Sequence, residues 1–296
     1  MTRDRLTVLA PAKINPYLEI RGRRADGYHE LALVFQAIGL ADRVTVERGD
    51  TEHIRLRCDD PGLPTDDRNL AWRAAQRLRE QFPEIGGVNL TLAKRIPAGA
   101  GLAGGSADAA AVLVAMNLLW DLGLTVPELA ALGATLGADV AFCVTGGTAL
   151  GTGRGDILSP LPPVEGLTVV VAKPRNLSVS TPEAYRIFRE EGLLVARSGQ
   201  QLHDFLAAWA TGDPAAIAPH LFNDLERAVL PHHPEIVALK QELLAAGAVG
   251  ALMSGSGSAV FGLVPDPATG QRIAAGLTGV ETWVTHAYRG GIAVVA

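Results

Sequence analysis

The chain has 296 residues, of which 48% are hydrophobic and 19% are charged, so it can bury a large core. Its length favours about two domains. The 26 Lys and Arg residues against 31 Asp and Glu give a net charge of -5, and no basic block alternates with aromatic residues, which argues against a nucleic-acid partner.

The N-terminus, Met1–Arg5, lacks the apolar segment of a secretory signal. The longest apolar run, Ala109–Trp120, is too short to span a bilayer and contains Asn117. We therefore expect a cytoplasmic protein with no membrane partner. Its two cysteines, Cys58 and Cys143, have no CxxC spacing and are expected to stay unpaired in a reducing compartment.

In chain order, short alternating segments that are typical of half-buried strands are mixed with helical patterns. Runs of strands followed by runs of helices favour an α+β fold over a doubly wound parallel sheet. The expected strands in the first half are Ala10–Ile20, Arg43–Glu47, Ile54–Arg57 and Val88–Leu92. The expected helices are Asn69–Gln81, Ala107–Leu122, Val126–Gly137, Pro182–Glu191 and Pro234–Ala246.

A segment rich in Pro and Gly, Ser159–Gly166, predicts the boundary between two domains, 1–163 and 164–296. After it, Leu167–Val171 is expected to be a buried strand. Further strands are expected at Ala259–Val264 and Trp283–Tyr288, whereas Ala196–Pro219 carries no recognisable chemistry.

The glycine-rich stretch "PAGAGLAGGSADAA", Pro97–Ala110, contains a GxGxxG pattern. A dinucleotide-binding fold is disfavoured because Ala93–Pro97 separates the preceding strand from the glycines, and that strand alternates. The chain also lacks the HRD and DFG motifs of protein kinases and the Gly-Lys pair of a Walker A loop.

The composition of this stretch instead predicts a phosphate cradle. Pro97 stiffens its entry, the glycines let successive N–H groups turn toward one point, and Ser106 or Asp108 is expected to cap the next helix. A helix N-terminus offers free donors and partial positive charge to a phosphate. The alternative is a glycine-rich turn that is capped by its own serine.

The opening strand places Lys13, Asn15 and Tyr17 on one face, and Ile14, Leu18 and Ile20 on the other. Lys13 is flanked by Ala12 and Ile14, with Pro11 and Pro16 nearby, so it lies in an apolar setting. A functional role there competes with that of an ordinary solvent-facing lysine.

Directly after the turn signal Asp26-Gly27, the pair Tyr28 and His29 offers an aromatic ring and an imidazole. Together they suit stacking on, and hydrogen bonding to, a planar base. The alternative is a hairpin with a packed tyrosine.

In "LGADVAFCVTGG", Asp139 follows a helix that ends at Gly137 and has apolar neighbours, so its carboxylate needs a partner, for which Lys13 is suitable. In "SGSGSAVFG", the segment Gly255–Gly257 predicts either a second loop against a ligand or a tight turn. The pair His232-His233 is better explained by a surface turn than by a metal site, since no further ligand has matching spacing.

Four segments in this order, "PAKINPYLEIRGRRADGYHE", "PAGAGLAGGSADAA", "LGADVAFCVTGG" and "SGSGSAVFG", resemble the GHMP kinase superfamily over nearly the whole chain. The resemblance implies an N-terminal domain like ribosomal protein S5 domain 2, a ferredoxin-like C-terminal α/β domain, and an active site in the cleft between them. The AKIN strand followed by GRRADGYH resembles the members whose small-molecule substrate is a cytidyl diphosphate sugar alcohol.

For those members the implied reaction is phosphorylation by ATP, with Mg²⁺, of the 2-hydroxyl of 4-diphosphocytidyl-2-C-methyl-D-erythritol, in non-mevalonate isoprenoid biosynthesis. The resemblance implies catalytic roles for Lys13 and Asp139, with Asp139 either a base or an aligner of the hydroxyl. It implies substrate contacts for Asn15, Tyr28, His29 and Thr181. It implies ATP contacts for Asn69, Lys94, Pro97, Ala98, Gly99, Ala100, Gly101, Leu102, Ala103, Gly104, Gly105, Ser106 and Ala107.

Two residues depart from the superfamily loop: Ala103 replaces a frequent glycine and Ala107 a frequent second serine. No protein ligand of Mg²⁺ is assigned, although the Ser106 hydroxyl is a candidate contact. A homoserine or mevalonate type of kinase, or a catalytically silent ligand sensor, are the alternatives. A monomer and a homodimer are both compatible with the sequence.

Overall fold

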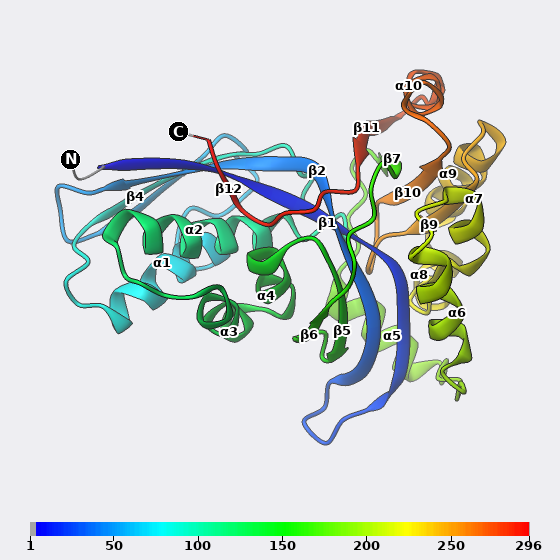
Figure 1. Ribbon diagram of the computed structural model, residues 1–296, viewed down its shortest axis with the longest axis horizontal. Helices are drawn as coiled ribbons and strands as arrows, with labels where there is room; N and C mark the ends of the chain where they lie inside the picture. Colours follow the sequence, from blue (N-terminus) through cyan, green and yellow to red (C-terminus); the bar gives the residue numbers. More distant parts are fainter. Residues whose placement is uncertain (1–3, 296) are drawn as a thin grey trace.

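The computed structural model describes residues 4–295, so the first three residues of the N-terminal stretch discussed above lie outside it. The first half of the chain contains a long hairpin, further strands and four helices (Figure 1). These elements are β1 (Arg5–Arg23), β2 (His29–Arg48), β3 (Ile54–Cys58), α1 (Leu70–Gln81), β4 (Val88–Ala93), α2 (Gly104–Trp120), α3 (Val126–Leu136), α4 (Ala138–Thr145), β5 (Thr148–Gly153) and β6 (Ile157–Pro160).

The second half forms another sheet with helices around it. Its elements are β7 (Thr168–Pro174), α5 (Thr181–Glu190), α6 (Gln200–Trp209), α7 (Pro214–Ile217), β8 (Phe222–Asn223), α8 (Glu226–Val229), α9 (Pro234–Ala245), β9 (Gly250–Met253), β10 (Val260–Val264), α10 (Pro267–Gly276), β11 (Val280–His286) and β12 (Ala293–Val294). Short 3₁₀ helices cover Ala218–His220 and Leu230–His232.

The first sheet has eight strands, with β12, β1, β2, β4 and β3 in that order, β5 and β6 continuing from β2, and β8 beside β1. Helices α1 to α4 lie on one side of it (Figure 1). Apolar side chains of the strands face these helices, and Phe35 of β2 stacks on Phe142 of α4 with ring centroids 4.7 Å apart. The mixture of strands and helices agrees with the expected α+β class.

The second sheet has the order β11-β7-β10-β9, with antiparallel neighbours throughout. Helices intervene between β7 and β9 and between β10 and β11, as in a ferredoxin-like β-α-β-β-α-β arrangement. The expected C-terminal fold is confirmed. Strand β7 is buried along its whole length, which explains its unbroken apolar sequence.

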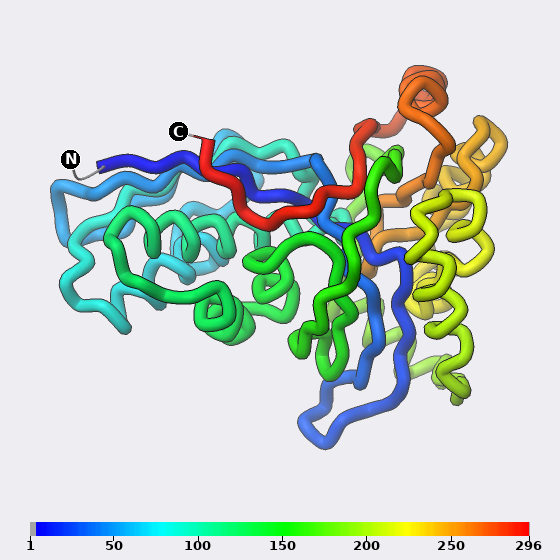
Figure 2. Tube along the Cα trace, in the orientation of Figure 1, coloured from blue at the N-terminus to red at the C-terminus, as the bar shows by residue number. Residues whose placement is uncertain are grey.

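Two segments from late in the chain return to the first sheet. Strand β8 pairs in parallel with β1, and β12 pairs antiparallel with β1. Figure 2 accordingly shows both chain ends on the same side of the molecule. The domain boundary at residues 163 and 164 stays a prediction, although β7 opens the second sheet five residues beyond Pro163.

The long strand β1 contains two prolines, and its pairing with β2 shifts register beside each of them, between Pro11 and Ala12 and between Ile14 and Tyr17. Bulges are where proline is tolerated in a sheet. The second bulge reverses the alternation of side chains. The prediction that Tyr17 shares a face with Lys13 and Asn15 is therefore wrong: Tyr17 is fully buried against Phe205 and Phe222.

Several local boundaries differ from the sequence prediction. Helix α2 begins at Gly104, three residues earlier than expected, and α4 begins directly after Gly137, so that Asp139 lies in a first turn. The segment that carried no signal, Ala196–Pro219, contains the whole of α6 and α7. Within residues 4–295, no helix combines the length and apolarity that crossing a membrane requires.

Candidate active site

A cavity of about 1030 Å³ opens beside the glycine-rich stretch. This volume is at the top of the range of about 300–1,000 Å³ that is usual for small-molecule sites. Its walls come from β1, the β1–β2 turn, the N-termini of α2, α4 and α5, and the loop before β10. Every predicted site residue lines it except Ala107, which is fully buried in α2.

Lys13 and Asp139 meet in this cavity, as the sequence predicts. The Lys13 ammonium is almost fully buried, donates to Asn15 Oδ1 at 2.7 Å and to Gly101 O at 2.8 Å, and lies 3.5 Å from Asp139 Oδ2. The carboxylate remains about one third exposed toward the cavity. Its place in the first turn of α4 also suits a negative charge.

The backbone of the glycine-rich stretch alternates in handedness. Gly99, Gly101 and Ala103 have φ angles of 61°, 73° and 59°, while the residues between them do not have positive φ. Such alternation turns successive N–H groups toward one point and creates an anion-binding concavity. Ala103 adopts this conformation without being glycine, so the departure from the superfamily loop leaves the cradle intact.

The hydrogen bonds of this stretch are divided between its two sides. The carbonyls of Gly99, Ala100, Gly101 and Leu102 all accept hydrogen bonds from protein groups. In contrast, within residues 4–295, no backbone amide of 98–106 donates a hydrogen bond. A row of backbone amides without protein acceptors at a cavity wall offers free donors to an anionic ligand.

The loop 254–259 donates hydrogen bonds to the carbonyl groups of the glycine-rich stretch. Ser258 N and Ala259 N donate to the carbonyls of Gly99 and Ala100, and Ser254 Oγ donates to Gly101 O. Gly255 and Ser256 line the cavity. The second small-residue segment is therefore both a wall of the cavity and a support of the first.

The predicted cap of α2 is wrong. Neither Ser106 nor Asp108 caps it, since the N-cap is Ala103 without a side-chain hydrogen bond. Because the helix starts early, Asp108 lies inside it, where the buried Lys94 ammonium bonds both Asp108 and Asp42. Burial raises the pKa of Asp108 to about 7, with Asp42 adding to the rise and Lys94 opposing it.

The predicted nucleotide contacts Asn69 and Lys94 both line the cavity but have partners within the protein. Asn69 caps α1, with its side chain accepting from Ala71 N at 2.9 Å and donating to Pro64 O at 2.8 Å. Asp42 also accepts hydrogen bonds from Arg95 N and Ile96 N. Lys94 and Asp42 thus fix the strand end that leads into the cradle.

The far end of the cavity is aromatic. Tyr28 is 57% exposed, and the His29 ring stacks on Tyr185 of α5 with centroids 5.0 Å apart. Burial, together with the charges of Arg189 and Arg23, lowers the pKa of His29, so its imidazole is neutral at pH 7. Thr181 also lines the cavity, and its hydroxyl lies 2.7 Å from that of Ser256.

Sequence reasoning missed, among others, Tyr185 and Arg154 on the cavity wall and Asp42, which pairs with Lys94. Tyr185 had a usable signal, because it is four residues after Thr181 and so shares its helix face. Arg154 and Asp42 had none, since their contacts with Tyr28 and Lys94 join segments far apart in the sequence.

Comparison with known proteins gives two family matches. The model of the GHMP kinases N terminal domain matches residues 69–147, and that of the GHMP kinases C terminal domain matches 205–280. Together they cover more than half of the chain. A relative from Synechocystis sp., "4-diphosphocytidyl-2-C-methyl-D-erythritol kinase", is 46% identical, with 98% of each chain covered.

Solved structures agree with this match. A crystal structure of 4-(cytidine 5'-diphospho)-2C-methyl-D-erythritol kinase superposes with a TM-score of 0.79 at 39% identity, covering 96% of this chain and 100% of the other. Homoserine kinase from Cytophaga hutchinsonii has a TM-score of 0.80 but only 23% identity, covering 100% and 98%, and so supports the fold alone. The chain therefore belongs to the GHMP kinase family, and within it to the 4-diphosphocytidyl-2-C-methyl-D-erythritol kinases.

Proposed function

We propose that this protein transfers the γ-phosphoryl group of ATP to the 2-hydroxyl of 4-diphosphocytidyl-2-C-methyl-D-erythritol, giving the 2-phosphate and ADP. The observation that carries the proposal is one cavity that holds a row of free backbone amides, the pair Lys13 and Asp139, and an aromatic end. The family and the near full-length relatives supply the identity of the substrate.

The chemistry is an in-line displacement in which positioning and charge stabilisation do most of the work. The 2-hydroxyl oxygen forms a bond to the γ-phosphorus, the bond from phosphorus to the bridging oxygen of ADP breaks, and the hydroxyl proton passes to the Asp139 carboxylate. Lys13, whose Nζ lies 3.5 Å from Asp139 Oδ2, orients that carboxylate and offsets the charge of the γ-phosphate in this proposal.

The amides of residues 98–106 hold the phosphates of ATP in this proposal, and the N-terminus of α2 adds positive potential. Mg²⁺ neutralises phosphate charge in such reactions and is usually held by one or two protein oxygens and the phosphates themselves. The Ser106 hydroxyl is an oxygen donor on this wall that would fit such a role. Asn69 and Lys94 remain proposed nucleotide contacts.

The aromatic end receives the cytidyl group in this proposal. The exposed ring of Tyr28 suits stacking on a planar base, and the neutral His29 imidazole has one donor and one acceptor for its edge. Asn15 and Thr181 lie on the cavity wall as proposed contacts of the remaining substrate. The cytoplasmic location and the choice between monomer and homodimer stay predictions.

The test is ATP consumption by the purified protein with three alcohols: the cytidyl substrate, mevalonate and homoserine. We expect turnover with the first only, and a product whose new phosphate is on the 2-hydroxyl by ³¹P NMR. Turnover with mevalonate or homoserine alone would replace the proposed substrate. Binding of ATP and the cytidyl substrate without any turnover would favour the ligand sensor.

A further inference from the structure

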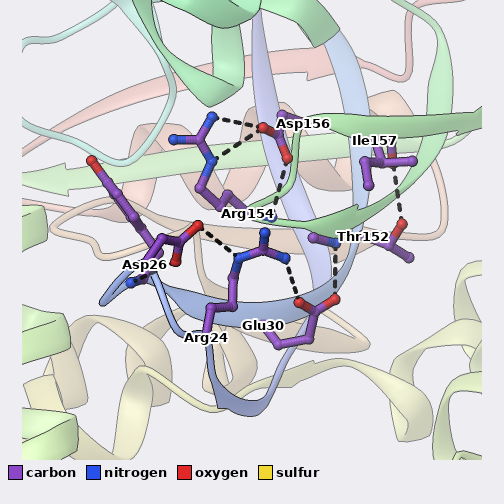
Figure 3. Close-up of polar contacts among 9 residues, drawn as sticks. Arg24, Asp26, Glu30, Thr152, Arg154, Asp156 and Ile157 are labelled. Carbon is purple, nitrogen blue, oxygen red and sulfur yellow. Dashed lines mark hydrogen bonds and ion pairs between the residues drawn. The ribbon is translucent and has the colours of Figure 1, made fainter.

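Arg154, in the turn between β5 and β6, lies over the ring of Tyr28. Its Cζ atom is 5.0 Å from the ring centroid, within the distance of a cation–π contact. The guanidinium is fixed by Asp156, whose Oδ2 accepts from Nε at 3.1 Å and from Nη2 at 2.8 Å (Figure 3). The Arg154 backbone N–H donates to the same carboxylate at 3.1 Å.

A chain of hydrogen bonds also links the backbone of the turn that carries Tyr28 to the backbone at the end of β5, next to the β5–β6 turn. Asp26 accepts from Tyr28 N at 3.1 Å and from Arg24 Nε at 3.1 Å. Arg24 Nη1 in turn donates to Glu30 Oε2 at 2.7 Å, and Glu30 Oε1 accepts from Gly153 N at 3.2 Å. Figure 3 shows Arg24 between Asp26 and Glu30, beside Arg154 and Asp156.

These contacts restrain the Tyr28 side chain, which is largely exposed to solvent. Tyr28 is more than half exposed, so packing alone does not hold its ring. Ordering a free side chain on binding weakens affinity. A guanidinium that is held by Asp156 and lies over the ring restrains the Tyr28 side chain before any ligand arrives, and both residues line the cavity.

We propose that Arg154 is a positioning residue that sets the affinity for the cytidyl group by fixing Tyr28, which rests on the proposed function for its ligand. Arg154 acts through the Tyr28 ring, with Asp156 holding the guanidinium and the Arg24–Glu30 pair holding the backbone. The pair Tyr28 and Arg154 therefore behaves as one unit in binding.

The test is a double-mutant cycle with Arg154→Leu and Tyr28→Leu, measured as KM for the cytidyl substrate and, by calorimetry, as Kd for CDP. In the parent protein, Arg154→Leu is expected to raise both about 2- to 30-fold, the range for a cation–π contact, with kcat and KM for ATP unchanged. In the Tyr28→Leu background the same change is expected to have no effect. Arg154→Lys, which keeps a cation without the paired hydrogen bonds, is expected to lie in between.

Arg68 is a matched control, because it also lines the cavity and pairs with a carboxylate two residues away, Asp66, but makes no contact with Tyr28. Any effect of Arg68→Leu is expected to be equal in both backgrounds. Equal effects of Arg154→Leu in both backgrounds, or none in the parent protein, would overturn the proposal. Failure of the parent protein to phosphorylate the cytidyl substrate would refute the proposed function instead, and the CDP cycle would still decide the role of Arg154.

Discussion

The two ends of the cavity are built in different ways. At the proposed phosphate end, the groups that face the cavity are backbone amides, supported by hydrogen bonds to their neighbouring carbonyls and by the buried Lys13 ammonium. At the aromatic end, they are side chains near the surface, and ion pairs with exposed partners such as Arg24 and Glu30 fix them.

The difference separates chemistry from selectivity. Backbone amides do not distinguish one phosphate chain from another. Binding at this end therefore depends on the conformation of the loop and not on its side chains. In the proposed function, side chains at the other end recognise the cytidyl group, and we expect them to tolerate replacement without loss of the fold. We therefore expect binding at the phosphate end to be weakened by substitutions that enlarge a side chain, and binding at the aromatic end to be weakened by substitutions that remove one.

The largest expected effect is on the chemical step. Asp139→Asn keeps the size of the side chain but removes the proton acceptor, so kcat is expected to fall about 10²- to 10⁴-fold, while Kd for ATP stays within a few-fold. Single-turnover kinetics and ATP titration measure the two separately. A kcat close to that of the parent protein would remove Asp139 from the mechanism.

The next largest effect is expected at the buried ion pairs of Lys94 with Asp42 and Asp108. Lys94→Met leaves Asp42 and Asp108 buried without their shared cation, so the free energy of unfolding is expected to fall by about 3–5 kcal/mol, as measured by urea denaturation. The matched control is Arg68→Met, at an exposed ion pair, for which a loss below about 1 kcal/mol is expected. Similar losses for both variants would contradict a structural role of Lys94.

At the cradle itself, an added methyl group is enough to disturb binding. A Cβ atom at Gly101 would lie 2.0 Å from Ser254 O, and its backbone has a positive φ that costs about 1–3 kcal/mol without glycine. We expect Gly101→Ala to weaken ATP binding at least about tenfold in calorimetry, because 1.4 kcal/mol is tenfold. Gly105→Ala, where the nearest atom is 3.9 Å away, is the control and should bind ATP normally.

At the aromatic end, we expect a substitution to weaken binding of the cytidyl substrate and not of ATP. Tyr28→Ala removes a stacking surface worth about 1–3 kcal/mol and is expected to raise KM for the cytidyl substrate about 5- to 150-fold without changing Kd for ATP. Steady-state kinetics with both substrates varied would measure it. An unchanged KM would show that Tyr28 has only a structural role in the β1–β2 hairpin.

The last expected effect is a dependence of stability on pH. Burial raises the pKa of Asp108 from its unfolded value of 3.8 to about 7, so the folded protein holds this proton more tightly than the unfolded chain. Stability from this group is therefore greatest below about pH 4 and is lost as the pH rises toward 7. Asp108→Asn is expected to remove that slope in urea titrations between pH 5 and 8. Parallel curves for the two proteins would contradict it.

Much of the fold could be predicted from local patterns. The boundaries of α1, α3 and β4 lie within one residue of the prediction, because capping residues and alternation are written in neighbouring positions. Residues 196–219 gave nothing, since α6 and α7 are short helices whose apolar side chains, such as Phe205 and Trp209, are defined by their burial against the rest of the fold.

The sequence by itself determined the site's chemical inventory: a loop that needs left-handed backbone at Gly99 and Gly101, a lysine in an apolar strand, and an isolated aspartate that needs a partner. Only the tertiary structure decided how these are used. The bulge at Pro16 turned Tyr17 away from Lys13, the early start of α2 placed Asp108 on Lys94 instead of the helix end, and the β5–β6 turn brought Arg154 to Tyr28. The physical reason is that conformational preference is local, whereas the pairing of charges and rings depends on which distant segments the packed core brings together.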